Sequence, residues 1–271
     1  MTERMTIRPV STFVGAEILD VDLAGSLPEP TVDAIRRALF QHGVVFFRDQ
    51  KLTPEQHVAF AQRFGEININ RFFKAVDGHP MIAEVRKEPE QKGNIGGGWH
   101  TDHSYDQAPA MGSILYAREV PETGGDTLFA SMYAAYEALP QHLKNRLDGR
   151  KGVFTYGGRR KATALLNAED RDWVPVRHPI IRTHPETGRK ALYFDPGKIL
   201  EIEGLEEEES DALIDELTGR MIQPEGEYRH RWRKGDIVIW DNRCSYHKAA
   251  GDYPPEEDRV HWRVSIKERQ P

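Results

Sequence analysis

Residues 259–266 read Arg-Val-His-Trp-Arg-Val-Ser-Ile, a stretch in which polar and apolar side chains alternate strictly. Because successive side chains of a β-strand lie on opposite faces, one face is apolar and the other carries Arg259, His261 and Arg263. Two arginines that face a protein interior are costly unless each meets an anion. The stretch therefore predicts a strand that lines the inside of a barrel and binds anions, with a solvated strand face as the alternative.

Similar patterns occur over much of the chain. Tyr228, His230 and Trp232 alternate with arginines, and the turn Lys234-Gly235-Asp236 leads into an apolar run at 237–240. Strands in the second half outnumber helices, which predicts a mainly β protein, a β-sandwich or jelly roll, with helices packed outside. The other expected strands are residues 44–47, 114–116, 180–183 and 191–194, the last two joined by Pro185-Glu186-Thr187-Gly188.

Four helical segments are expected, and two of them carry start and stop signals. Thr31 is a candidate N-cap for a helix that ends at Gly43. Thr53-Pro54-Glu55-Gln56 is a capping box with proline in the first turn, and its helix is expected to stop at Gly65. The other two segments are residues 132–147, interrupted at Pro140, and residues 206–218, which open on an acidic run.

Composition narrows the class of protein. The 271 residues contain 37 Lys and Arg and 43 Asp and Glu, a net charge of −6 that lacks the basic footprint of nucleic-acid binding. The single cysteine, Cys244, excludes an intramolecular disulfide and fits a reducing compartment. No signal peptide and no run of about 20 apolar residues is present. These features predict one cytoplasmic domain over residues 1–271 whose partner is a small molecule, not nucleic acid or a membrane.

Another cluster of polar residues lies far upstream, at Trp99-His100-Thr101-Asp102. In an extended segment, the side chains of His100 and Asp102 lie on the same face and reach one metal ion together. The third ligand has to come from a distant segment, and His247 is the best candidate because it follows an apolar strand. Two histidines and one carboxylate form the facial triad that binds Fe(II) and leaves three positions open.

Other interpretations of these residues stay open. Chance His-x-Asp pairs are common in a chain with 11 histidines. Zinc accepts the same ligands and would make the protein a hydrolase, but zinc gives no reason for the C-terminal arginines. A jelly-roll binding module without turnover is a further alternative. We interpret His42, His57, His79, His142, His178 and His184 as surface or turn residues, and His230 and His261 as core residues of strands.

Taken together, these segments are similar to the taurine dioxygenase/2,4-D dioxygenase family, whose members depend on Fe(II) and 2-oxoglutarate. The resemblance covers nearly the whole chain, from Gly15-Ala16-Glu17 to the final strand. The residues that carry it are His100-Thr101-Asp102, Gly124-Gly125-Asp126-Thr127-Leu128, Trp240-Asp241-Asn242-Arg243 with His247, and Arg259 with Arg263.

The family implies a double-stranded β-helix core, with iron ligands at His100, Asp102 and His247. It also implies 2-oxoglutarate as co-substrate, O2 as oxidant, and a homodimer or homotetramer. Trp240 and Asn242 would have structural roles. Asp102 argues against a halogenase, which needs a small residue at this position to leave room for a halide.

The family also implies how the co-substrate is bound. The distal carboxylate of 2-oxoglutarate would lie against Arg259 and the hydroxyl of Thr127, which the Gly124-Gly125 pair presents. Arg263 matches an arginine that faces either the co-substrate or the anionic group of the primary substrate.

The substrate pocket departs from the family members that bind taurine. Their His, Tyr and Asn are replaced here by Asn70, Phe73 and Gly96, so three polar contacts are lost. We therefore expect a small anionic organic substrate other than taurine, oxidised at a C–H bond, most simply by hydroxylation, with release of succinate and CO2. The residues expected to line its pocket are Asn70, Phe73, Tyr105, Phe154, Tyr156 and Arg263, with core packing as the alternative for the four aromatic residues.

Two further segments each have two interpretations. Gly96-Gly97-Gly98 permits either a close backbone approach with a mobile lid, or an ordinary loop. Arg159-Arg160-Lys161 either recruits an anion or is a solvated run of charge.

Overall fold

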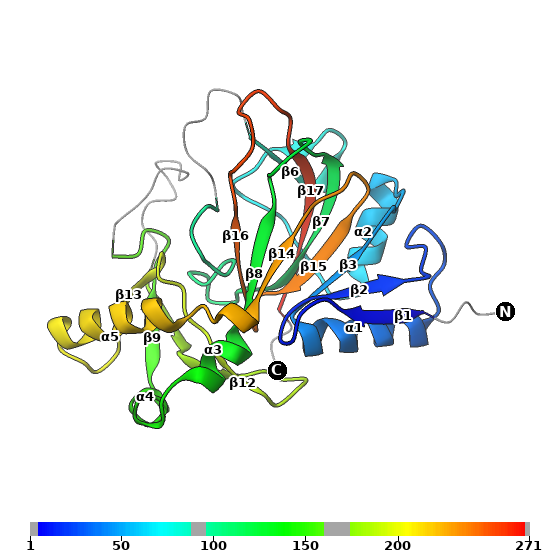
Figure 1. The fold of residues 1–271 in the computed structure, drawn as a ribbon. Coiled ribbons are helices and arrows are strands. Elements are labelled where there is room, and N and C mark those ends of the chain that lie inside the picture. Colours follow the sequence, from blue (N-terminus) through cyan, green and yellow to red (C-terminus); the bar gives the residue numbers. More distant parts are fainter. Residues whose placement is uncertain (1–4, 88–95, 160–173, 269–271) are drawn as a thin grey trace.

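The largest element of the structure, a computed structural model that describes residues 5–87, 96–159 and 174–268, is a nine-stranded sheet. Its strands run in the order β1-β2-β3-β15-β7-β17-β6-β5, and β4 pairs with β17 (Figure 1). The strands are β1 (Thr6–Pro9), β2 (Ala16–Leu19), β3 (Val44–Phe47), β4 (Ile67–Asn68), β5 (Ala75–Val76), β6 (His79–Arg86), β7 (Ala110–Glu119), β15 (Ile237–Asp241) and β17 (Val260–Lys267).

A three-stranded sheet packs against the inner face of the large one. It has the order β14 (Glu227–His230), β8 (Thr127–Ser131), β16 (Ser245–Ala249), and these strands run side by side in Figure 1. Phe129 of β8 packs with Phe46 of β3, Leu115 of β7 and Trp240 of β15 in one buried cluster between the sheets. The two facing sheets form the jelly roll, or double-stranded β-helix, that the sequence predicted.

The other face of the large sheet is covered by α1 (Glu29–His42) and α2 (Pro54–Gln62). Val45 and Phe47 of β3 and Ile237 and Ile239 of β15 belong to this second cluster, whereas their strand neighbours point inward. Because successive side chains alternate between the faces, a central strand covered on both sides is apolar throughout. This double coverage explains the unbroken apolar runs at 44–47 and 237–240.

The ends of these two helices test the capping predictions. Gly43 ends α1 with a left-handed φ of 69°, and the capping box of Thr53 and Gln56 opens α2. Both features are confirmed. The expectation for Thr31 was wrong, because α1 begins earlier, at Glu29, after Pro28. Helix α2 also ends before Gly65, at Gln62.

The remaining elements form a lobe beside the two facing sheets, on the side away from β1 and β2 in Figure 1. Pro140 separates α3 from α4, as the sequence predicted. The longest helices have 14 residues, and no helix within the described ranges combines the length and apolar character that a membrane span requires. The lobe contains α3 (Met132–Ala138), α4 (Gln141–Leu147), α5 (Glu207–Arg220), β9 (Lys151–Phe154), β10 (Val176–Pro179), β11 (Ile181–Thr183), β12 (Lys190–Leu192) and β13 (Ile199–Ile202).

Several histidines lie deeper than the sequence suggested. His57 and His178 are buried in α2 and β10, so their interpretation as surface or turn residues was wrong. His184 is also buried, but it lies in the turn between β11 and β12, so the turn interpretation holds. His230 and His261 are buried in the strand layers, as expected. A histidine has no sequence signature of burial, because its ring fits an apolar environment when neutral and a polar one when charged.

Candidate active site

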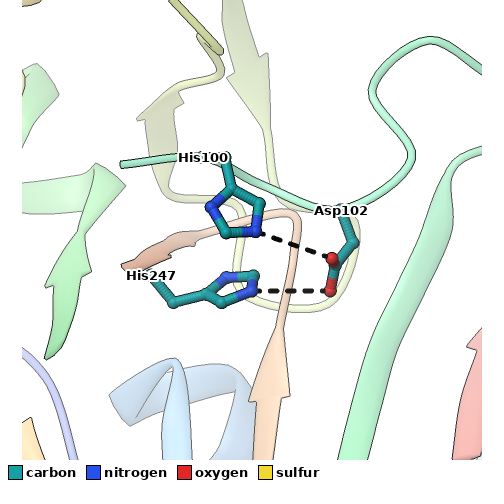
Figure 2. Close-up of side chains that lie close together, drawn as sticks. All are labelled: His100, Asp102 and His247. Carbon is teal, nitrogen blue, oxygen red and sulfur yellow. Dashed lines mark ion pairs between the residues drawn. The ribbon is translucent and has the colours of Figure 1, made fainter. Parts of the chain in front are cut away.

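Three predicted ligands converge on the inner side of the jelly roll. Figure 2 shows the side chains of His100, Asp102 and His247 pointing toward one another. Their candidate ligand atoms all lie within 4.8 Å of one another. His100 Nε2 is 4.0 Å from Asp102 Oδ1, and His247 Nε2 is 3.8 Å from Asp102 Oδ2. Residues 100–102 do not form a regular strand; one β-bridge between His100 and His247 brings the two segments together. The arrangement can share one metal ion among three side chains.

The hydrogen bonds around the triad leave atoms free to bind a metal. The carbonyl of Gly98 accepts from His100 Nδ1 at 2.8 Å, which leaves the lone pair on Nε2. Asp102 Oδ2 accepts from Trp240 Nε1 at 3.2 Å and lies 2.7 Å from Arg263 Nη2. No side chain in the described ranges donates to Asp102 Oδ1. The donor set therefore fits a divalent cation of the kind that imidazole and carboxylate bind.

The electrostatics favour the same protonation states that metal binding needs. Burial lowers the pKa of His247 far below its ordinary value, and neighbouring His100 adds to the effect. Burial alone raises the pKa of the Asp102 carboxyl, but Arg263, then His247 and His100, outweigh it and hold that pKa well below the usual range. A neutral imidazole and an ionised carboxylate are the forms that bind metal.

Trp240 and Asn242, for which the family implied structural roles, hold Asp102 in place. Besides its bond to Asp102, Trp240 Nε1 lies 2.9 Å from Asn242 Oδ1. Asn242 in turn donates from Nδ2 to the carbonyl of Ala110 at 3.2 Å. Ser113, which the sequence analysis did not single out, donates to Asp102 Oδ2 at 3.4 Å. These groups fix the orientation of the carboxylate.

A buried arginine faces the same pocket and has no carboxylate partner among the residues that the structure describes. Arg259 is 9% exposed, and its Nε donates to the carbonyl of Gly125 at 2.8 Å. Its Nη2 lies 3.4 Å from Thr127 Oγ1, which also accepts from Trp232 Nε1 at 3.0 Å. No acidic side chain in the described part of the chain lies within 4.0 Å of the Arg259 guanidinium. An unpaired buried guanidinium calls for an anion.

The glycine pair before Thr127 makes this arrangement possible. Gly124 and Gly125 have φ angles of 73° and 66°, which favour glycine. A Cβ on Gly124 would lie 2.1 Å from the carbonyl oxygen of Asp252, and one on Gly125 would lie 2.8 Å from Pro121. Only glycine fits at these positions, so the loop can bring its backbone carbonyl against Arg259.

The triad and Arg259 open into one pocket of about 340 Å³. Of the residues predicted to contact substrate, Asn70, Phe73, Tyr105, Tyr156 and Arg263 all line it. For Phe154 the pocket interpretation was wrong and the core interpretation holds, because its side chain is fully buried in the core of the lobe, away from the pocket.

The two segments with alternative interpretations are partly resolved. Gly96 and Gly98 line the pocket, and Gly96 has a φ of 74°. Arg159 pairs with Asp211 and Asp215 of α5, which favours an ordinary charged surface. Arg160 and Lys161 lie outside the described residues. Sequence analysis missed Lys198, which also lines the pocket and follows the turn at Asp195 and Gly197; no local pattern marks this lysine.

A second cluster of potential ligands, the closed cluster, consists of His184, Asp241, Arg243 and Cys244. The candidate ligand atoms of His184, Asp241 and Cys244 also lie within 4.8 Å of one another. Asp241 Oδ2 accepts from Arg243 Nη2 at 2.7 Å and lies 3.0 Å from His184 Nε2, while its Oδ1 accepts from Arg243 Nε at 2.9 Å. The backbone N–H groups of Glu186 and Thr187 donate to His184 Nδ1. Hydrogen bonds within the protein therefore occupy both carboxylate oxygens of Asp241 and both ring nitrogens of His184, which a metal ion would need as ligand atoms.

A jelly roll with two histidines and one aspartate on its inner side has the arrangement of the facial-triad class of oxygenases. A family model described as "Taurine catabolism dioxygenase TauD, TfdA family" matches residues 6–265. The chain belongs to this family, and it is a 2-oxoglutarate-dependent dioxygenase.

Individual relatives are similar over almost the full length. The chain is 34% identical to an alkylsulfatase of Acinetobacter baylyi, over 98% of this chain and 86% of that protein. It is also 34% identical to the (S)-phenoxypropionate/alpha-ketoglutarate-dioxygenase of Sphingobium herbicidovorans, over 98% and 96%. The solved structure of AAD-2 in complex with Mn(II) and N-oxalylglycine is 28% identical, with a TM-score of 0.85 and coverage of 99% of both chains.

Proposed function

We propose that residues 1–271 form one domain in which His100, Asp102 and His247 hold Fe(II), and that it oxidises a C–H bond of a small anionic substrate, most simply by hydroxylation. The observation that carries the proposal is that the triad and Arg259, a buried arginine with no carboxylate partner in the described part of the chain, open into the same pocket. A metal with three free positions and a nearby cation together suit 2-oxoglutarate, which chelates through one end and carries a carboxylate at the other.

Arg259 and Thr127 bind the distal carboxylate of 2-oxoglutarate in this proposal. Trp232 Nε1 and Arg259 Nη2 both donate to the oxygen of Thr127, so its own proton is left to donate to an acceptor. The planar guanidinium offers further N–H groups to the same carboxylate. A negatively charged ligand at this position would also stabilise the buried charge of the Arg259 guanidinium.

Bound Fe(II) would supply the activation of O2, coupled to the conversion of 2-oxoglutarate into succinate and CO2. The chain's own residues position the reactants and exclude water. Trp240, Ser113 and Arg263 hold the carboxylate of Asp102. This metal ligand therefore keeps its orientation when substrates bind. The aromatic wall formed by Phe72, Phe73, Tyr105 and Tyr156 keeps the substrate side of the pocket largely apolar.

The names of the relatives support the proposed substrate class. Alkylsulfatase and phenoxypropionate dioxygenase both name organic molecules with an anionic group on an apolar body. Taurine is not the expected substrate, because Asn70 and Phe73 replace polar groups of the taurine-binding members. The Asn70 side chain is itself engaged, since its Oδ1 accepts from the backbone N–H groups of Phe72 and Phe73.

A cytoplasmic location and assembly as a homodimer or homotetramer complete the proposal. Cys244 is buried and free, which suits a reducing compartment.

Anaerobic addition of Fe(II) and 2-oxoglutarate tests the function. We expect the weak visible charge-transfer band of the chelate, followed by O2-dependent release of succinate. A colourless mixture would contradict the iron site. Elemental analysis that finds zinc, with turnover independent of O2, would favour a hydrolase, and failure to consume any 2-oxoglutarate would favour a binding module.

A further inference from the structure

Lys198 is a half-buried cation in the wall of the pocket. Its Nζ donates to the carbonyl of Tyr156 at 2.7 Å and lies 4.0 Å from the centre of the Tyr156 ring and 5.3 Å from that of Tyr105. No carboxylate in the described ranges lies within 4.0 Å of it. Because an ammonium has three N–H donors and the protein uses one, the remaining donors are available to a ligand.

Asp195, three residues before Lys198, does not neutralise Lys198 by direct contact. Asp195 is fully buried, and its oxygens accept from Ser104 Oγ and from the backbone N–H of Gly197, each at 3.0 Å. Burial lowers the pKa of Lys198, and the charge of Asp195 opposes the decrease only from a distance. An anion bound in the pocket would restore the stabilisation that burial removes.

The other two strong cations of the pocket have partners or an assigned ligand. Arg263 Nη2 lies 2.7 Å from Asp102 Oδ2 and donates to Ser113 Oγ at 2.9 Å, while Nε donates to Ser265 Oγ at 3.2 Å. Arg259 contacts Thr127, where the distal carboxylate of 2-oxoglutarate is proposed to bind. Of the Lys and Arg side chains that line the pocket, Lys198 alone has neither a carboxylate within 4.0 Å among the described residues nor an assigned anion.

The surroundings of Lys198 are aromatic. The rings of Phe72 and Tyr156 stack at 5.4 Å, and Tyr105 meets Tyr156 edge-on at 5.1 Å. Such a wall favours an apolar body and gives little solvation to a charge. A ligand that suits both features has an anionic head and an aromatic or alkyl body.

We propose that Lys198 binds the carboxylate or sulfate group of the primary substrate, whose apolar body lies against Phe72, Tyr105 and Tyr156. The inference rests on the proposed function and goes beyond it, because it moves recognition of the substrate anion from Arg263 to Lys198. Arg263 then acts mainly on Asp102, as a positioning residue.

Calorimetric titration of the anaerobic enzyme loaded with Fe(II) and 2-oxoglutarate tests the assignment. The probes are phenoxyacetate and hexyl sulfate, each paired with a neutral analogue, phenoxyethanol or hexanol. We expect Lys198→Met to weaken both anions about 10- to 100-fold and to change the neutral analogues less than about twofold. Lys198→Arg should keep most of the affinity, because it retains the charge. The two head groups show whether carboxylate or sulfate is preferred.

Lys190→Met is the matched control, since Lys190 lies on β12, outside the pocket, and its Nζ is 5.9 Å from the Tyr136 ring. Unchanged anion affinity in Lys198→Met, an equal loss for neutral analogues, or a native enzyme that binds neither anion would each overturn the assignment. A native enzyme that fails to bind 2-oxoglutarate before any probe is added would instead overturn the proposed function.

Discussion

The metal triad and the closed cluster contain similar residues but differ in what their polar atoms contact. Both combine histidine, aspartate and a nearby arginine, and both bring candidate ligand atoms within 4.8 Å. In the closed cluster, Arg243 and His184 occupy both oxygens of Asp241. In the triad, Asp102 Oδ1 and His100 Nε2 face a pocket.

This difference shows that proximity of ligand-type residues is not sufficient for a metal site. A buried carboxylate whose oxygens accept from protein donors is part of the fold, because its charge is already stabilised. A carboxylate with an oxygen directed into a pocket, beside a neutral imidazole, can bind a cation. The same rule separates Arg243, which is paired, from Arg259, which is not.

The largest expected contrast is between Asp102→Ala and Asp241→Ala. Asp102→Ala should reduce 2-oxoglutarate turnover by on the order of 1000-fold or more, because a metal ligand is lost. Asp241→Ala should lower the free energy of unfolding by about 3–5 kcal/mol, because Arg243 is left buried without its partner. Succinate release, metal content and urea unfolding measure these effects.

The opposite pattern would contradict the comparison. Loss of bound metal in Asp241→Ala with unchanged stability would mean that the closed cluster is the metal site. The folded fraction of each variant, measured by circular dichroism, separates lost chemistry from lost structure.

The two arginines give the second contrast. Arg259→Met removes a buried charge that has no carboxylate partner among the described residues, together with its hydrogen bonds to Gly125 and Thr127, so we expect a smaller loss of stability than for Arg243→Met. It should raise the 2-oxoglutarate requirement about 30- to 1000-fold, the equivalent of about 2–4 kcal/mol. Arg243→Met should destabilise the protein by about 3–5 kcal/mol, because Asp241 is left unpaired.

Steady-state titration of 2-oxoglutarate and urea unfolding measure both variants. Equal destabilisation by the two substitutions would show that Arg259 has a structural partner and would weaken the case for a co-substrate site.

Acid titration gives the smallest expected effect. Burial raises the pKa of the Asp241 carboxyl, but Arg243 and His184 outweigh it, so the pKa in the folded protein lies below the ordinary value of 3.8. The unfolded chain therefore takes up the proton first as the pH falls. The contribution of ionised Asp241 to the free energy of unfolding is complete above about pH 5. Below about pH 4 this contribution decreases by about 1.4 kcal/mol per pH unit.

In Asp241→Asn, the free energy of unfolding should depend less on pH between about pH 5 and about pH 3 than in the native protein. Urea unfolding over this pH range measures the difference. A variant profile parallel to that of the native protein would mean that Asp241 has no depressed pKa in the fold.

Local patterns predicted much of the architecture. Alternation of polar and apolar residues indicated β17, and an unbroken apolar run indicated β15. The capping box marked the start of α2, and Pro140 separated α3 from α4. The errors have local causes as well. Thr31 has the chemistry of an N-cap, but Pro28 already begins α1 one turn earlier. An aromatic ring such as that of Phe154 suits a pocket wall and a hydrophobic core equally well. In the structure it packs in the core of the lobe.

Residue type, spacing and family resemblance predicted the candidate ligands His100, Asp102 and His247. They did not predict which carboxylates pair with the positively charged side chains of the pocket. The pairing of Arg263 with Asp102 and the absence of a carboxylate beside Arg259 depend on segments that are remote in sequence. Lys198 has no motif at all, and only its place in the pocket wall marks it.

By itself, the sequence determined several of the strands, some of the helix boundaries and the set of residues able to bind a metal, because these depend on backbone periodicity and side-chain chemistry within short segments. Only the tertiary structure decided which His and Asp cluster is closed and which is open, and which of the three cations in the pocket, Arg259, Arg263 and Lys198, has a carboxylate partner among the described residues. The physical reason is that the stabilisation of a buried charge depends on distances of a few ångströms between side chains that the chain order leaves far apart.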